Sequence, residues 1–356
     1  MTLATPPSQA PPVLRVTDLK KHFPIKKGLF SRIHGHVKAV DGVSFELGRG
    51  ETLGLVGESG CGKTTTGRLI LKLVEPSSGD VRLGDSPNLA QIPNRQWLPY
   101  RRRIQMIFQD PFSSLNPRMP VGSIIGEALA IHKLAARGEQ RIKRVHELLE
   151  QVGLNAEAAK RFPHEFSGGQ RQRIGIARAL AVQPEIIIAD EPVSALDVSI
   201  QAQVINLLED LQKQMGLSYL FISHDLGVIG HLCHRVAVMY LGKIVEIGPG
   251  TALLQQPRHP YTKALLSAVP TIEKEKRRKR IILQGDVPSP VNPPTGCHFH
   301  PRCPHRFAPC DKSYPNLAPL GDGSVRVACH LYDPQYKDQL PESFRSSQSS
   351  PAVLTA

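Results

Sequence analysis

The chain has 356 residues, of which 40% are hydrophobic and 21% are charged, and it carries a formal net charge of +13 at pH 7. This length suggests about two domains and is ample for a large buried core, and the composition is that of an ordinary globular protein. No stretch approaches the roughly 18 apolar residues that a membrane-spanning helix needs, so helices that cross a membrane are excluded.

The excess of positive charge calls for an anionic partner, and nucleotides, nucleic acids and acidic lipid head groups all fit. The densest basic run, residues 274–280, has Glu275 as its one negative charge, and a solvated linker face is the alternative to a binding patch. Residues 1–12 are rich in Pro, Ser and Thr, which predicts a disordered lead-in. They lack a basic segment followed by an apolar one, so we expect no export signal and a chain kept in the cytosol.

Short apolar segments, several of them β-branched, predict strands along the chain. They are residues 44–47, 52–56, 186–189, 219–222, 235–239 and 243–247. Helical periodicity fills several of the intervals, as in the apolar face formed by Val204, Leu207, Leu208 and Leu211. Strands that alternate with helices predict an α/β fold, with a mostly parallel core sheet and helices on both sides.

Breaks in these patterns divide the chain. A helical stretch predicts a helical subdomain over about residues 97–180, with Leu148 and Leu149 on its apolar face and Gly153 as a stop. The breaker Gly248-Pro249-Gly250 then ends a first domain that we expect over residues 13–249. A Pro-rich, Cys-containing extension follows over residues 250–332, and the polar residues 333–356 predict a flexible tail.

A Gly-rich segment stands between the predicted strand 52–56 and a helical pattern, and it matches G-x-x-x-x-G-K-[ST] in full. Its residues are Gly57, Glu58, Ser59, Gly60, Cys61, Gly62, Lys63 and Thr64, followed by Thr65. Glycines let backbone N–H groups turn toward phosphate oxygens, and a helix N-terminus adds partial positive charge. We expect Lys63 to bridge the β- and γ-phosphates of a nucleotide and Thr64 to bind Mg²⁺. The strand–loop–helix context disfavours a plain Gly-rich turn, and Cys61 is interpreted as a small filler.

An apolar strand far downstream ends in two carboxylates, Asp190 and Glu191. Asp190 is expected to hold Mg²⁺, directly or through water, and Glu191 to polarise the water that attacks the γ-phosphate. An apolar run that ends in acidic residues is common by itself. Together with the phosphate loop, it becomes strong evidence for a nucleotide site.

A second anion site is predicted at Ser167, Gly168, Gly169 and Gln170. Ser167 is a natural N-cap, and the free N–H groups beyond it can bind an anion. One nucleotide with one phosphate loop does not need a second site on the same chain. We therefore expect this segment to face a nucleotide held by another subunit.

Together, these residues resemble the ATP-binding cassette (ABC) family over residues 14 to about 247. The resemblance implies a P-loop ABC nucleotide-binding domain with a mostly parallel core sheet, an antiparallel β edge and a helical subdomain, and it implies ATP and Mg²⁺ as cofactors. Gln109 resembles the glutamine that senses the metal and contacts the membrane subunit, and His224 resembles the switch histidine that steadies the γ-phosphate. Phe23 is the candidate for stacking on adenine. The loop that couples two sites corresponds to Ser194, Ala195, Leu196 and Asp197.

Residues 257–262 and 293–310 further resemble the ATPase subunits of dipeptide and oligopeptide importers, closest to the dipeptide type that pairs with a second, non-identical ATPase. The resemblance implies ATP hydrolysis that powers peptide uptake, at the cytoplasmic side of the inner membrane. The implied partners are the second ATPase, two integral membrane permeases and an extracytoplasmic peptide-binding protein, with no nucleic acid.

Four cysteines of the extension are candidates for one soft metal centre: Cys297, Cys303, Cys310 and Cys329. Thiolates suit an iron–sulfur cluster or tetrahedral zinc. Structural zinc usually shows a tight C-x₂₋₄-C pair, which is absent here, and the wider spacing favours a [4Fe–4S] cluster. The resemblance to peptide importers points the same way. Four reduced cysteines in a packed extension are the alternative.

Three other functions fit parts of this sequence. An ABC importer ATPase for another solute, such as nickel or a glycoside, would share the same motifs. A soluble ABC ATPase that acts on nucleic acid or ribosomes has only the basic charge in its favour, because a second cassette and a long coiled-coil insert are missing. A non-catalytic regulatory cassette is disfavoured by the intact Ser167, Glu191 and His224.

Overall fold

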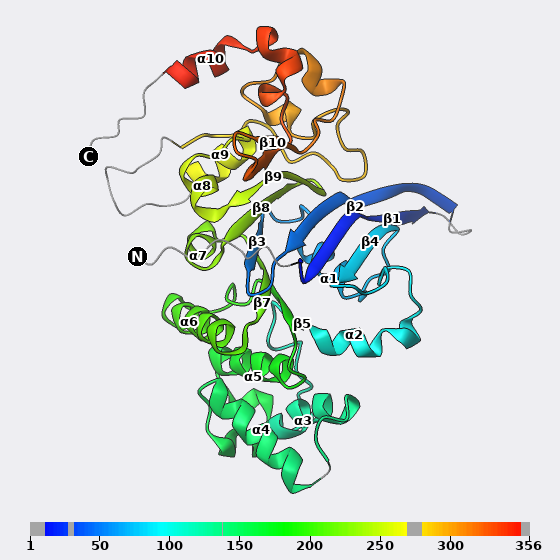
Figure 1. Ribbon diagram of the computed structural model, residues 1–356, viewed down its shortest axis with the longest axis vertical. Coiled ribbons are helices and arrows are strands. Elements are labelled where there is room, and N and C mark those ends of the chain that lie inside the picture. Colours follow the sequence, from blue (N-terminus) through cyan, green and yellow to red (C-terminus); the bar gives the residue numbers. More distant parts are fainter. Residues whose placement is uncertain (1–10, 28–31, 137, 269–279, 350–356) are drawn as a thin grey trace.

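The computed structural model describes residues 11–27, 32–136, 138–268 and 280–349. It is elongated, with a central sheet, helices α3 to α5 gathered at one end and the C-terminal residues at the other (Figure 1). A smaller sheet projects from one side of the centre. Residues 1–10 of the predicted lead-in, and the predicted basic run apart from Arg280, lie outside the described residues.

Within the described ranges the central sheet has eight strands, in the order β10-β11-β9-β8-β3-β7-β6-β5. In that order their bounds are Ala318–Leu320, Val325–Val327, Lys243–Pro249, Arg235–Tyr240, Thr52–Val56, Ser218–Ser223, Ile186–Asp190 and Ile104–Ile107. The five strands from β8 to β5 are parallel, whereas β9, β11 and β10 each run antiparallel to their neighbour. The sheet is therefore mixed, with a parallel core.

The strand predictions in this core are confirmed. β3 has the predicted bounds, and β6 and β7 exceed theirs by one residue at one end or at both. Every residue of these three strands is buried, because helices or the smaller sheet cover both faces. A strand buried on both faces reads as an unbroken apolar run, which is why its sequence predicts it well.

Two parts of the sheet differ from expectation. The helical prediction over residues 97–180 overlooked β5, a four-residue edge strand of the core. The chain after Gly250 also returns to the sheet, since β11 pairs with β9 through Arg326↔Ile247 and Val327↔Glu246. The C-terminal segment thus extends the central sheet. Strands of three or four residues carry too little periodicity to be detected in a sequence.

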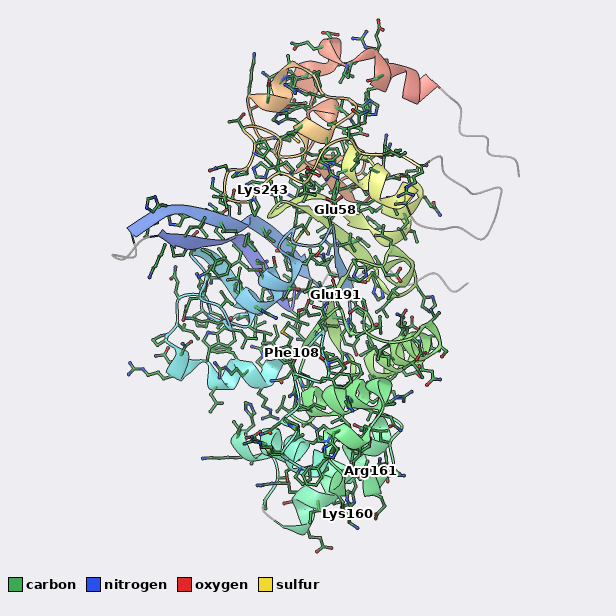
Figure 2. The ribbon with its side chains drawn as sticks, turned by 180° about the vertical axis from the view of Figure 1, so that it is seen from behind. Glu58, Phe108, Lys160, Arg161, Glu191 and Lys243 are labelled. Atoms are coloured by element: carbon green, nitrogen blue, oxygen red, sulfur yellow. The ribbon has the colours of Figure 1, made fainter. Side chains whose placement is uncertain are left out.

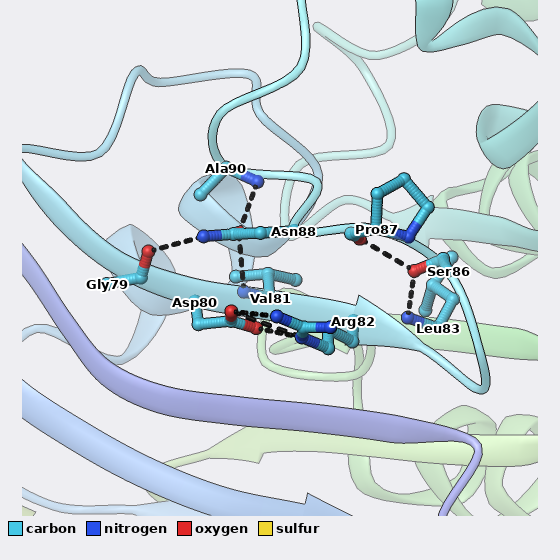
Figure 3. A network of polar contacts seen from close by, with 9 residues as sticks. All are labelled: Gly79, Asp80, Val81, Arg82, Leu83, Ser86, Pro87, Asn88 and Ala90. Carbon is cyan, nitrogen blue, oxygen red and sulfur yellow. Dashed lines mark hydrogen bonds and ion pairs between the residues drawn. The ribbon is translucent and has the colours of Figure 1, made fainter.

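The smaller sheet is antiparallel, with the order β2-β1-β4 and the bounds Arg32–Leu47, Leu14–Lys27 and Ser78–Leu83. It supplies the expected antiparallel β edge, although only residues 44–47 of β2 were predicted as strand. The turn after β4 is closed by Asn88, whose Oδ1 accepts hydrogen bonds from the backbone N–H groups of Val81 and Ala90 (Figure 3). Asn88 Nδ2 donates to the carbonyl of Gly79 at 3.1 Å.

Helices cover both faces of the central sheet. Their bounds, from α1 to α10, are Lys63–Ile70, Leu98–Arg103, Val121–Ile131, Glu139–Gln151, Gly168–Leu180, Val198–Met215, Leu226–Leu232, Gly250–Gln255, Pro260–Ser267 and Glu342–Ser349. The predicted apolar face of α6 is confirmed, because Val204, Leu208 and Leu211 are buried. The stop after α4 is also confirmed: Gly153 adopts a φ of 75°, a left-handed conformation that glycine adopts at helix ends.

The described part of the predicted flexible tail contains regular structure. Residues 334–349 form a 3₁₀ turn, Pro334–Gln339, and helix α10, and Phe344 is buried with 2% of its surface exposed. The Phe344 ring packs edge-on against Tyr332 and His305. Two isolated aromatic residues, Tyr336 and Phe344, give no periodicity in a polar stretch, so composition alone could not predict this docking. In the described part of the chain, no helix is long and apolar enough to span a bilayer.

Candidate active site

The Gly-rich loop lies between β3 and α1, and two of its glycines are required by close backbone contacts. A Cβ atom on Gly57 would lie 2.2 Å from the carbonyl oxygen of Met239, and one on Gly62 would lie 2.3 Å from that of Ala39. Gly62 has a φ of 109°, which side chains rarely adopt. The loop therefore packs against β2 and β8, with the N-terminus of α1 open to a ligand.

Lys63 is buried at the centre of this loop. Its Nζ donates hydrogen bonds to the carbonyls of Gly57 at 2.8 Å and Glu58 at 3.2 Å. These acceptors are neutral, and Nζ also lies 4.0 Å from the sulfur of Cys61. Cys61 is buried beside Gly57, in agreement with its interpretation as a filler, and burial raises the pKa of its thiol.

Thr64 and Asp190 come together from α1 and β6. The Thr64 hydroxyl donates a hydrogen bond of 2.8 Å to Asp190 Oδ1. Burial raises the pKa of Asp190, against the opposing effects of this hydrogen bond and of the positive charge on Arg68. An oxygen pair at the mouth of a phosphate loop is the donor set that Mg²⁺ prefers, and a divalent cation there would favour the ionised carboxylate.

Three polar side chains meet at the ends of three neighbouring strands. Glu191 Oε2 accepts a hydrogen bond of 2.9 Å from Gln109 Nε2 and lies 3.2 Å from His224 Nδ1. Gln109 follows β5, Glu191 follows β6 and His224 follows β7, which are adjacent and parallel. The carboxyl ends of parallel strands share one edge of the sheet, so the topology brings together residues that are far apart in sequence. Figure 2 shows Glu191 at the centre of the molecule.

These groups line one pocket of about 380 Å³. Its walls are Ala39, Ser59, Gly60, Gly62, Lys63, Thr64, Thr65, Gln109, Glu191 and His224. All of them except Ala39 are residues that the sequence singles out. Ala39 carries no reactive group, so no signal in the sequence indicates that it lines the pocket, and only its position on β2 shows this. A pocket with a backbone cradle, a buried ammonium and a carboxylate at one end can bind a polyphosphate and activate a water molecule.

Phe23 is not among the residues that line this pocket. It lies on β1 opposite Val37, with 37% of its surface exposed and Lys21 Nζ 4.9 Å from its ring centre. Its proposed contact with adenine stays a prediction.

The predicted second anion site lies at the start of α5 and does not contribute to the pocket. Ser167 is the N-cap, as predicted: its Oγ accepts from the N–H of Gln170, and Gln170 Oε1 accepts from the N–H of Ser167. The segment predicted to couple two sites, residues 194–197, begins beside Glu191 and ends at the start of α6. Ser194 Oγ donates to the carbonyl of Glu191 at 3.0 Å, and Asp197 caps α6 through the N–H of Ile200.

Two residues of the C-terminal segment reach the phosphate loop, and the sequence analysis missed both. The N–H of Glu58 donates to Tyr261 Oη at 2.8 Å, and the Glu58 carboxylate accepts two hydrogen bonds from Arg302. These partners lie 203 and 244 residues away from Glu58 in the chain. No local pattern marks such contacts.

The four predicted cysteines line one small cavity of about 10 Å³. The cavity also includes His259, His300, His305 and His330 among its walls. Burial raises the pKa of Cys297 to about 11 and that of Cys303 to about 12. Two buried ring nitrogens, His259 Nε2 and His330 Nδ1, have no hydrogen-bond partner. Within the described ranges, no group of three or more His, Cys, Asp or Glu side chains is arranged so that it could hold a metal ion. Cys233 lies apart, next to Gly54.

Comparisons with known proteins agree with this architecture. The profile of the ABC transporter family matches residues 40–194, and that of the oligopeptide/dipeptide transporter C-terminal region matches residues 245–310. The chain is 55% identical to the oligopeptide transport ATP-binding protein AppF of Bacillus subtilis, over 90% of this chain and 97% of that protein. It is 51% identical to the dipeptide transport ATP-binding protein DppF of Escherichia coli, over 93% of this chain and 97% of that protein.

A solved structure extends the agreement to three dimensions. The dimeric ATP-binding cassette MJ0796, bound to ADP and Pi, superimposes with a TM-score of 0.59 and 28% identity, over 66% of this chain and 98% of that one. The fold is therefore the P-loop ABC ATPase fold. With its phosphate loop, its strand-end carboxylates and its matched C-terminal region, the chain belongs to the family of ABC transporter ATPases that carry the oligopeptide/dipeptide transporter C-terminal region.

Proposed function

We propose that this chain hydrolyses ATP to power the uptake of dipeptides or oligopeptides across the cytoplasmic membrane. The observation that carries the proposal is the convergence of Gln109, Glu191 and His224 on the pocket formed by the phosphate loop. The relatives named for peptide transport, which match along almost their whole length, support the cargo class.

Each residue has a role in this proposal. Residues 57–65 cradle the triphosphate, with Lys63 turning from its carbonyl partners to the β- and γ-phosphates. Thr64, Gln109 and Asp190 hold Mg²⁺, which when bound neutralises charge on the phosphates. Glu191 accepts the proton of the attacking water, and Gln109 and His224 orient its carboxylate.

The segment at Ser167 completes the site of a companion subunit. The start of α5 lies outside this chain's own pocket, so this helix end can face a nucleotide of another subunit. The dimeric MJ0796 cassette supports such an assembly. We infer a second, non-identical ATPase, two integral permeases and an extracytoplasmic peptide-binding protein as partners, with this chain peripheral on the cytoplasmic side of the membrane and without nucleic acid.

A transport assay tests the function. The chain, co-expressed with the permeases and the second ATPase, is reconstituted in liposomes together with the binding protein. We expect MgATP-dependent accumulation of a radiolabelled dipeptide, competed by unlabelled peptides. Accumulation of nickel or a glycoside without peptide would show that this solute, and not peptides, is the cargo. Co-purification with RNA or ribosomes instead of permeases would contradict the importer proposal.

We also propose that Cys297, Cys303, Cys310 and Cys329 hold a [4Fe–4S] cluster that ties the C-terminal region together. Four thiols on one cavity are the donor set of such a cluster, and the unpartnered nitrogens of His259 and His330 suit a ligand at that place. The cavity of about 10 Å³ has no room for a cluster as it stands, so the loops that carry the cysteines would have to part.

Anaerobic purification tests the cluster. We expect about four iron and four sulfide per chain and a broad visible absorption, both lost in Cys310→Ser and kept in the control Cys233→Ser. A single zinc per chain would replace the cluster with a zinc site. Colourless protein with neither metal would leave four reduced, packed cysteines.

A further inference from the structure

Glu58, the second residue of the phosphate loop, is held by two side chains of the C-terminal segment. Its backbone N–H donates to Tyr261 Oη at 2.8 Å. Its carboxylate accepts from both terminal nitrogens of Arg302, at 2.9 and 3.3 Å. The Arg302 side chain is 9% exposed and that of Glu58 is 28% exposed, so this two-point ion pair is partly shielded from water. Figure 2 shows Glu58 close to where the C-terminal segment meets the central sheet.

Tyr261 is itself rigidly placed. It is fully buried in the first turn of α9, with its ring 4.6 Å from that of Tyr240 and 5.5 Å from that of Phe299. The turn before α9 is fixed by Glu246 on β9, whose buried carboxylate accepts from the N–H groups of Arg258 and His259. Ring packing and the anchored turn thus fix Tyr261 relative to the central sheet.

These contacts bear on the same peptide units that hold Lys63. Lys63 Nζ donates to the carbonyls of Gly57 and Glu58, and the peptide N–H between them is the one bound by Tyr261. An anchored loop loses less conformational freedom when a nucleotide binds. Glu58 does not itself line the pocket, but the next residue, Ser59, does. Without Arg302, an unpaired carboxylate would therefore lie one residue from the pocket wall, and its negative charge would oppose the binding of phosphates.

We propose that Tyr261 and Arg302 are positioning residues through which the C-terminal region sets the affinity of the phosphate loop for ATP. The proposal rests on the ATP-binding role of residues 57–64. The C-terminal region would thereby act in the ATPase cycle of its own chain, because its contacts through Tyr261 and Arg302 hold the phosphate loop in place.

A double-mutant cycle in the full-length chain tests the ion pair. Binding of trinitrophenyl-ATP with Mg²⁺ is titrated for wild type, Arg302→Ala, Glu58→Gln and the double variant, and KM and kcat are measured in the assembled transporter. We expect Arg302→Ala to raise the dissociation constant and KM about tenfold, with kcat changed less than about twofold. The double variant should recover most of the affinity, because neither charge is left unpaired. Arg302→Lys should lie between wild type and Arg302→Ala.

Arg306→Ala is the matched control, since Arg306 pairs with Asp311 within the C-terminal segment, and its ATP affinity should equal that of wild type. Wild-type protein that binds no nucleotide would refute the proposed function instead. If wild type binds and Arg302→Ala binds equally well, or if the double variant is as weak as Arg302→Ala, the inference is overturned. Should Arg302→Ala fail to fold, Tyr261→Phe decides: an unchanged dissociation constant overturns the inference, and a rise of about threefold supports it.

Discussion

Replacing Glu191 with glutamine is expected to lower the turnover rate of ATP hydrolysis by about 100-fold or more, with MgATP affinity within about twofold of wild type. Glutamine keeps the size of the side chain and can still contact Gln109 and His224, but it cannot accept the proton of the attacking water. The affinity should persist because the cradle for the phosphates belongs to residues 57–65. Steady-state phosphate release and equilibrium nucleotide titration measure the two quantities separately.

Glu209→Gln provides the control for this prediction. Glu209 also lies near a histidine, at 3.4 Å from His231, but on α6 and outside the pocket. Its turnover should equal that of wild type. Normal hydrolysis by Glu191→Gln would remove Glu191 from the role of base.

Lys63→Ala is expected to act one step earlier and weaken MgATP binding by about 100-fold, or about 2.7 kcal/mol. The Lys63 ammonium is buried with two carbonyl oxygens and the Cys61 sulfur as partners, so its charge can be redirected to phosphate oxygens. Removing it leaves the negative charge of the triphosphate uncompensated at the centre of the cradle. Isothermal titration with MgATP measures the loss.

Lys72→Ala is the matched control for Lys63→Ala. Lys72 follows the same helix, α1, and its side chain is almost as buried, at 6% exposed, but its Nζ contacts the carbonyl of Ile92 and the carboxylate of Glu75. Its loss should lower thermal stability and leave the affinity for ATP unchanged. Equal affinities for Lys63→Ala and wild type would contradict the phosphate role of Lys63.

Local chemistry was readable from the sequence because it depends on neighbours along the chain. The loop from Gly57 to Thr64, the buried strands before it and before Asp190, and the N-cap Ser167 each need only a few consecutive residues of the right type. The resemblance to the ABC family added Gln109 and His224, which carry no signal by themselves.

Contacts between distant segments were decided only by the tertiary structure. Gln109, Glu191 and His224 meet because β5, β6 and β7 are parallel neighbours, and β5 itself was too short to be predicted. The ion pair between Glu58 and Arg302 spans 244 residues, and Phe344 is buried although it lies in a polar stretch. Periodicity and composition report which residues a segment buries, but not which remote partner covers them, because that choice belongs to the packing of the whole chain.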